Sequence, residues 1–270
     1  MRTLVEDDVL SQLDVAVLQR YGKDADVGVF AVLSTGTRQI LRDFSSTLNL
    51  TRIKERLPHA LDLIKPLRLE LLTDTEISGR SDFDPAFCSA TNTQCMLYWR
   101  WSRCEAMISE EERRRGSTFS FVVRVRPDLE YYRLLPSAGE LASRKASEVF
   151  VEWDIMMIMR REVASTALTI YPIAAGYHPC IDGPHELCVL SALAAKGFEM
   201  HTMGGAVGLR RACKLKDEEV SGLLRSTCIG VWDTKPPPMF PCVIDPEPFD
   251  IVSKHYPWLN YYKQFQYPPH

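Results

Sequence analysis

Asp128 is the residue of this sequence best placed to do chemistry, because it follows the apolar run 119–125 in the turn Arg126, Pro127, Asp128. Ligands of α/β sheets gather at the carboxyl ends of strands, where a carboxylate can hold a divalent cation. Pro127 fixes its own φ and biases Arg126 toward an extended conformation, which directs Asp128 past the strand end. Arg124 and Arg126 lie on one face of the strand and could grip phosphate in a bidentate manner. The alternative is a surface turn with an Arg–Asp ion pair of little energetic weight.

Other acids offer a second carboxylate for acid–base chemistry. Asp154 ends the next strand-like segment, and its alternative roles are a helix N-cap or an ion pair with Arg160 or Arg161. Glu186 lies in the first turn of a predicted helix, where the helix dipole favours a carboxylate whether or not it acts as a catalytic base. Asp182 is its neighbouring competitor for that role.

The segment 178–188 contains four zinc-type ligands: His178, Cys180, His185 and Cys188. Their spacing is poor, since structural zinc sites usually bring two well-separated pairs together. A partly buried helix face explains His185 and Cys188 equally well, and a disulfide between Cys180 and Cys188 is the alternative if the protein is secretory. The glycine-containing pieces 34–37 and 203–208 lack the strand, glycine-rich loop and helix order of a phosphate-binding loop and predict turns.

The elements that position these residues alternate between helical and strand-like patterns. Helices are predicted at 4–21, 94–115 and 183–197, with Gly116 and Gly197 as stops. Strands are predicted at 27–33, 67–72, 119–125, 148–154 and 198–203, and residues 155–171 are predicted to form a strand edge followed by a helix. Such alternation predicts an α/β fold whose parallel or mixed sheet is covered on both faces.

Composition excludes several classes of protein. The chain has 270 residues, 46% hydrophobic and 25% charged, with a net charge of −3, so it lacks the basic excess that binding a nucleic-acid backbone requires. No window approaches the roughly 18 apolar residues of a membrane span, and acids stand where a signal peptide would be basic and apolar. Eight cysteines permit disulfides without settling the compartment. We therefore expect a soluble, untargeted globular protein.

The run 101–129, WSRCEAMISEEERRRGSTFSFVVRVRPDL, resembles the helix, strand and Arg-Pro-Asp turn of a widespread, mostly uncharacterised group of eukaryotic proteins similar to GT-A-fold nucleotide-sugar glycosyltransferases. The segments 148–164, 184–200 and 208–213 agree in order, so the resemblance covers residues 5 to 215. It implies a mixed, mostly parallel GT-A-like sheet flanked by helices over 1–215. It also implies that the sheet lacks its first strand. The Pro- and aromatic-rich residues 216–270 are predicted to be an extension that packs on this domain.

In function, the resemblance implies transfer of a sugar from a nucleotide-diphosphate donor to a hydroxyl acceptor. Asp128 resembles the last acid of the metal-binding DxD turn and would hold Mn²⁺ or Mg²⁺, while Arg126 stands where the Glu-Pro-Asp turn of fungal mannosyltransferases has its first acid. Arg124 and Arg126 would neutralise the diphosphate, and Asp154 and Glu186 would serve the acceptor. A place in the Golgi or endoplasmic-reticulum lumen follows if an upstream anchor is missing. The alternative is an inactive relative that binds a glycan or a protein.

Overall fold

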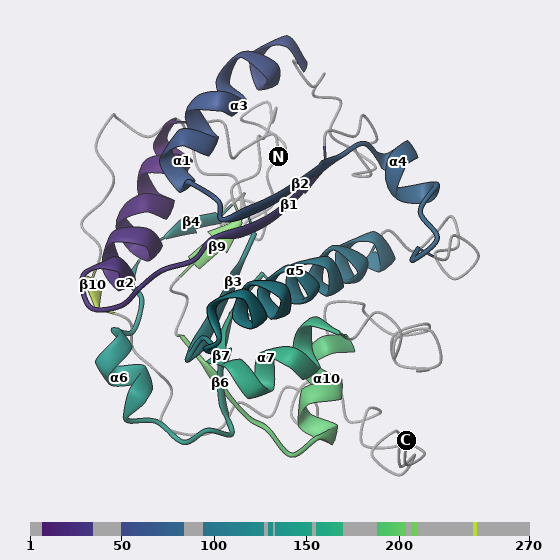
Figure 1. Ribbon diagram of the computed structural model, residues 1–270. Coiled ribbons are helices and arrows are strands. Elements are labelled where there is room, and N and C mark those ends of the chain that lie inside the picture. Colours follow the sequence, from purple (N-terminus) through teal and green to yellow (C-terminus); the bar gives the residue numbers. More distant parts are fainter. Residues whose placement is uncertain are drawn as a thin grey trace, which may run out of the picture. The chain divides into compact units, whose positions relative to one another are not determined.

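The chain is an α/β protein with mixed sheets (Figure 1). The computed structural model describes residues 7–34, 50–83, 94–126, 129–131, 133–152, 155–169, 188–203, 207–209 and 240–241. They belong to two units, each assembled from separate parts of the chain. The first comprises Met1–Asp84, Val125–Ser143 and Gly205–Cys242, and the second Pro85–Arg124, Arg144–Gly204 and Val243–His270.

The first unit begins with a continuous helical segment and a parallel pair of strands. The helical segment consists of α1 (Asp7–Leu13), the π-helix η1 (Asp14–Gln19) and α2 (Arg20–Gly22), which confirms the predicted amphipathic helix. Strand β1 (Phe30–Ser34) pairs in parallel with β2 (Arg68–Leu72), and both were predicted. The helix between them, α3 (Leu50–Ile64), was not predicted, because Pro58 inside it interrupts the helical signal.

Short elements complete the first unit. Strand β4 (Leu129–Tyr131) pairs antiparallel with β9 (Val207–Leu209), and β5 (Arg133–Leu134) pairs in parallel with β10 (Phe240–Pro241). Helices α4 (Asp74–Ser78) and α6 (Ala138–Ala142) each begin with a capping box. The buried Gln12 side chain ties α1 to β4, since its Oε1 accepts a hydrogen bond of 2.8 Å from the Tyr131 amide.

A four-stranded mixed sheet forms the centre of the second unit, in the order β3 (Phe121–Val125), β7 (Met156–Arg160), β6 (Glu148–Glu152), β8 (Glu199–Thr202). Strand β6 runs antiparallel to β7 and parallel to β8. All residues of β6 and the first four of β7 are buried. The expectation of a buried β3 is wrong in degree: only Arg124 is buried there and the other four residues are half-buried, because β3 ends the described sheet order.

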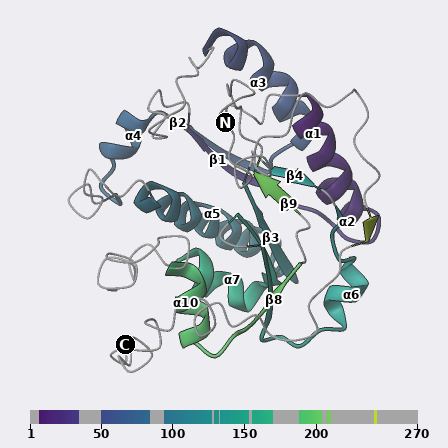
Figure 2. The same ribbon diagram turned by 180° about the vertical axis from the view of Figure 1, so that it is seen from behind.

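Helices α5 (Gln94–Arg115), α7 (Arg161–Leu168) and α10 (Cys188–Ala195) belong to the same unit. Helix α7 lies between α5 and α10 in Figure 1, and the opposite view shows α10 beside β8 (Figure 2). The predicted bounds of α5 are confirmed. Gly116 and Gly197 follow α5 and α10 with φ of +70° and +82°, as their predicted role as helix stops requires.

No helix within the described ranges is long and apolar enough to span a membrane. The predicted domain boundary near residue 215 lies outside the described residues, and of the segment 216–270 only residues 240–241 are described.

Candidate functional site

The predicted Arg-Pro-Asp turn begins one residue after β3 ends at Val125. Arg126 is half-buried, whereas Pro127 and Asp128 lie outside the described residues. The predicted acids Asp154, Asp182 and Glu186 also lie outside them, together with His178, Cys180 and His185 of the zinc-type set. Their roles stay predictions.

Arg124 is held by an aromatic ring. Its guanidinium carbon lies 4.2 Å from the centroid of the Trp101 ring on α5, and only 8% of the residue is exposed. A desolvated cation–π contact of this kind contributes about 2 kcal/mol. Arg124 therefore joins β3 to α5. If it also contacts a diphosphate, as predicted, it must do so while it keeps its contact with Trp101.

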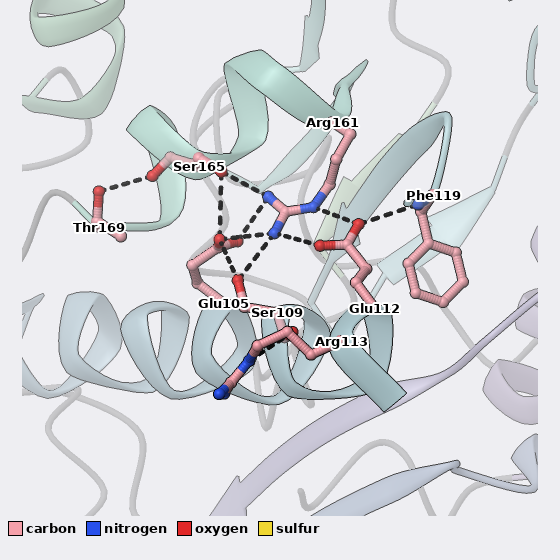
Figure 3. Close-up of polar contacts among 8 residues, drawn as sticks. All are labelled: Glu105, Ser109, Glu112, Arg113, Phe119, Arg161, Ser165 and Thr169. Atoms are coloured by element: carbon pink, nitrogen blue, oxygen red, sulfur yellow. Dashed lines mark hydrogen bonds and ion pairs between the residues drawn. The ribbon is translucent and has the colours of Figure 1, made fainter. Parts of the chain in front are cut away.

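A buried polar cluster joins α5 to α7 around Arg161 (Figure 3). The Arg161 guanidinium donates to Glu105 at 2.8 and 3.0 Å and to Glu112 at 2.8 and 2.9 Å. Ser165 and Ser109 accept further hydrogen bonds from it at 2.6 and 3.0 Å. The arginine and both glutamate side chains are each 10% exposed. Two carboxylates at i and i+7 on one helix thus share one bidentate cation.

Glu112 has its carboxylate oxygens committed within the protein. Oε1 accepts from Arg161 and from the Phe119 amide at 2.9 Å, and Oε2 accepts from Arg161. Burial acts to raise the pKa of Glu112, but these hydrogen bonds outweigh it and hold the pKa below its ordinary value. A shallow hollow of about 360 Å³ lies beside this carboxylate, lined by Ser109, Glu112, Arg113, Gly116, Ser117 and Thr118. We therefore interpret the cluster as a structural joint between α5 and α7, because the Glu112 carboxylate oxygens already accept hydrogen bonds from within the protein.

A second group, the Glu–Glu–His cluster, consists of Glu148 on β6 with Glu199 and His201 on β8. One ligand atom from each residue can be chosen so that all lie within 4.8 Å of one another. The Glu148 carboxylate lies 3.9 Å from His201 Nε2, and both residues are buried. Among the described His, Cys, Asp and Glu residues, this group is the one close enough to share a metal ion.

Basic residues before β6 border this cluster. Lys145 Nζ lies 3.2 Å from Glu199, and the Ser147 hydroxyl donates to the same carboxylate at 3.3 Å. Arg144 Nε lies 3.6 Å from Glu148. The pKa of Glu199 is lowered, chiefly by the hydrogen bond from Lys145. The Glu199 carboxylate is therefore held in the charged form that a metal ion requires.

The Glu–Glu–His cluster was not predicted from the sequence. Glu199 and His201 stand at i and i+2 of a predicted strand, which places both on one face, and this alternation was an available signal. Glu148, about fifty residues away in sequence, joins them through strand pairing.

The fold and these clusters define an α/β protein with a polar structural joint and a candidate cation site. Searches against protein families, curated protein sequences and solved structures return no match for this chain.

Proposed function

We propose that this chain is a glycosyltransferase that moves a sugar from a nucleotide-diphosphate donor to a hydroxyl acceptor. The observation that supports this proposal is the end of β3 at Val125, directly before Arg126 and the predicted Asp128 turn. Ligands of α/β proteins gather at the carboxyl ends of strands. The order of α5, β3 and this turn is the order that the resemblance to GT-A-fold enzymes predicts.

The proposed chemistry needs positive charge at the departing nucleotide diphosphate. Arg126 would supply it directly, and Asp128 would supply it through a bound Mn²⁺ or Mg²⁺. Asp154 and Glu186 would act on the acceptor hydroxyl, for which one of them must accept a proton. The mixed sheet of the second unit, with its antiparallel strand β7, is compatible with a GT-A-like arrangement.

A thermal-shift series with UDP- and GDP-sugars, with and without Mn²⁺, tests the proposal. A donor present at a hundred times its Kd stabilises the folded chain by about 2.7 kcal/mol, which raises Tm by several degrees. We expect one donor class to give this shift in a Mn²⁺-dependent manner. Asp128→Ala should abolish the Mn²⁺ dependence, whereas Asp24→Ala, at an exposed position, should keep it. Absence of a shift with every nucleotide sugar would refute the proposal.

The second candidate function is a glycan- or protein-binding module without catalysis. The burial of Arg124 against Trp101 favours it, because one of the two predicted diphosphate-binding arginines is already engaged. The two functions differ in turnover. A chain that binds a donor but releases no nucleoside diphosphate over hours, with or without added acceptors, is a binding module.

A further inference from the structure

We propose that Glu148, Glu199 and His201 bind one zinc ion between β6 and β8. These residues include none of those assigned to the nucleotide-sugar donor, and the zinc proposal does not depend on the glycosyltransferase proposal.

The parallel pairing of β6 with β8 places the three ligands. Glu148 is the register partner of Glu199, and Phe150 is the register partner of His201. Register partners in a sheet present their side chains to the same face, and so do residues two apart on one strand. The backbone of two paired strands therefore holds all three groups on one face, which is a more rigid support than a loop.

The surroundings of the Glu148 carboxylate are a second, independent observation that favours a cation at this place. Glu148 is 6% exposed, and its Oε2 accepts no hydrogen bond from the residues that the structure describes. Arg144 forms an ion pair with this oxygen, but its Nε is 3.6 Å away, beyond hydrogen-bonding distance. Leaving a carboxylate oxygen buried without a hydrogen bond is costly, and direct coordination to a metal would offset that cost.

The distances within the cluster suit an ion bound between the side chains. Glu148 Oε1 and His201 Nε2 are 3.9 Å apart, too far for a hydrogen bond. Two ligands that each lie about 2.0–2.2 Å from a tetrahedral zinc ion are themselves roughly 3.3–3.6 Å apart. All three ligand atoms lie within 4.8 Å of one another.

The chemistry of the ligands favours zinc over magnesium or calcium. One imidazole and two carboxylates match zinc, which accepts nitrogen and oxygen ligands, whereas magnesium and calcium prefer oxygen ligands alone. Two carboxylates balance the charge of the ion. Three protein ligands leave a fourth position for water, on the side of Glu199, whose side chain is 36% exposed.

Lys145 is the cation that would compete with zinc for Glu199, whose other oxygen accepts a hydrogen bond from Ser147. Its ammonium contacts Glu199 at 3.2 Å, but its side chain is 69% exposed, so this ion pair contributes little to stability. Exchange of this surface contact for a coordinate bond is favourable, and the ion then links β6 to β8.

Zinc binding to the full chain tests the site. The chelator-treated protein is titrated with ZnCl₂ by calorimetry, and cobalt(II) replaces zinc for absorption spectroscopy. We expect saturable binding of one zinc ion and a tetrahedral cobalt spectrum without thiolate charge-transfer bands. Glu199→Gln should weaken binding at least tenfold, and Glu55→Gln, an exposed position on α3, should leave it unchanged.

Two further variants keep the result interpretable. Lys145→Ala removes the competing cation and should bind zinc at least as tightly as the parent chain. His201→Gln should abolish binding, and Glu199→Gln carries the test if that buried change prevents folding, as judged by circular dichroism. Failure to bind zinc, or equal binding by Glu199→Gln, would overturn the proposal. So would thiolate bands that Cys188→Ser removes, because the zinc would then belong to residues 178–188.

Discussion

Replacement of Arg161 by methionine should destabilise the protein strongly at neutral pH. The methionine fills similar volume but leaves Glu105 and Glu112 without the cation that both carboxylates share. Loss of one partner of a buried ion pair costs about 3–5 kcal/mol. We expect about 3 kcal/mol, at the low end, because the Glu105 and Glu112 side chains each keep 10% exposure. The Ser109 and Ser165 hydroxyls also donate hydrogen bonds to Glu105, which the variant would keep.

The pH dependence of this loss distinguishes a buried charge from a packing defect. In the parent chain the pKa of Glu112 is lowered, so its contribution to stability is present above the unfolded-state pKa and is lost as pH falls through the folded-state pKa. Without Arg161, burial dominates and raises the folded-state pKa of Glu112. The stability of the variant then falls as pH rises between the unfolded and folded values, so the gap between variant and parent should be smaller at pH 5 than at pH 7.

Urea denaturation followed by tryptophan fluorescence measures both quantities, since Trp99 and Trp101 are buried on α5. A loss of about 3 kcal/mol raises the unfolded-to-folded ratio roughly a hundredfold. Arg113→Met is the matched control on α5. Arg113 is exposed and donates a long hydrogen bond of 3.3 Å to the Ser109 carbonyl, so its loss should stay within about 0.5 kcal/mol. A cost below about 1 kcal/mol for Arg161→Met, or an equal cost at both pH values, would refute the reasoning.

Two further predictions concern α5 and its end. Hydrogen bonds from Arg114 and then Arg115 lower the pKa of Glu111 to about 2, so its contribution to stability should be lost as pH falls from about 4.5 toward 2. In the Glu111→Gln variant, the urea midpoint should therefore change less with pH over that range than it does in the parent chain. The same pH dependence in both proteins would contradict this prediction. Gly116→Ala should cost about 1 kcal/mol, because φ is +70° while nothing lies within 4 Å of the added methyl group. Gly139→Ala, in open space within α6 and without positive φ, should instead stabilise by about 0.5 kcal/mol in the same denaturation assay, and a loss there would argue against a backbone origin for the Gly116 effect.

Elements were predicted correctly where the periodicity and the end signals lie within the element's own sequence. Helix α5 carries a continuous helical pattern closed by Gly116, and β6 contains the short apolar run 149–151 between acidic residues. Helix α3 escaped prediction because Pro58 argues locally against a helix, and the surrounding helical turns override it.

Hydrophobic periodicity was enough to predict the α/β class and a strand that ends just before Arg126. Which charged residues meet depends instead on the tertiary structure. Arg161 had Asp154 as a sequence-level candidate partner, but in the fold it binds Glu105 and Glu112, about fifty residues away. The Glu–Glu–His cluster likewise exists only through the β6–β8 register. No local pattern encodes such meetings, because they depend on which strands and helices pair across long loops.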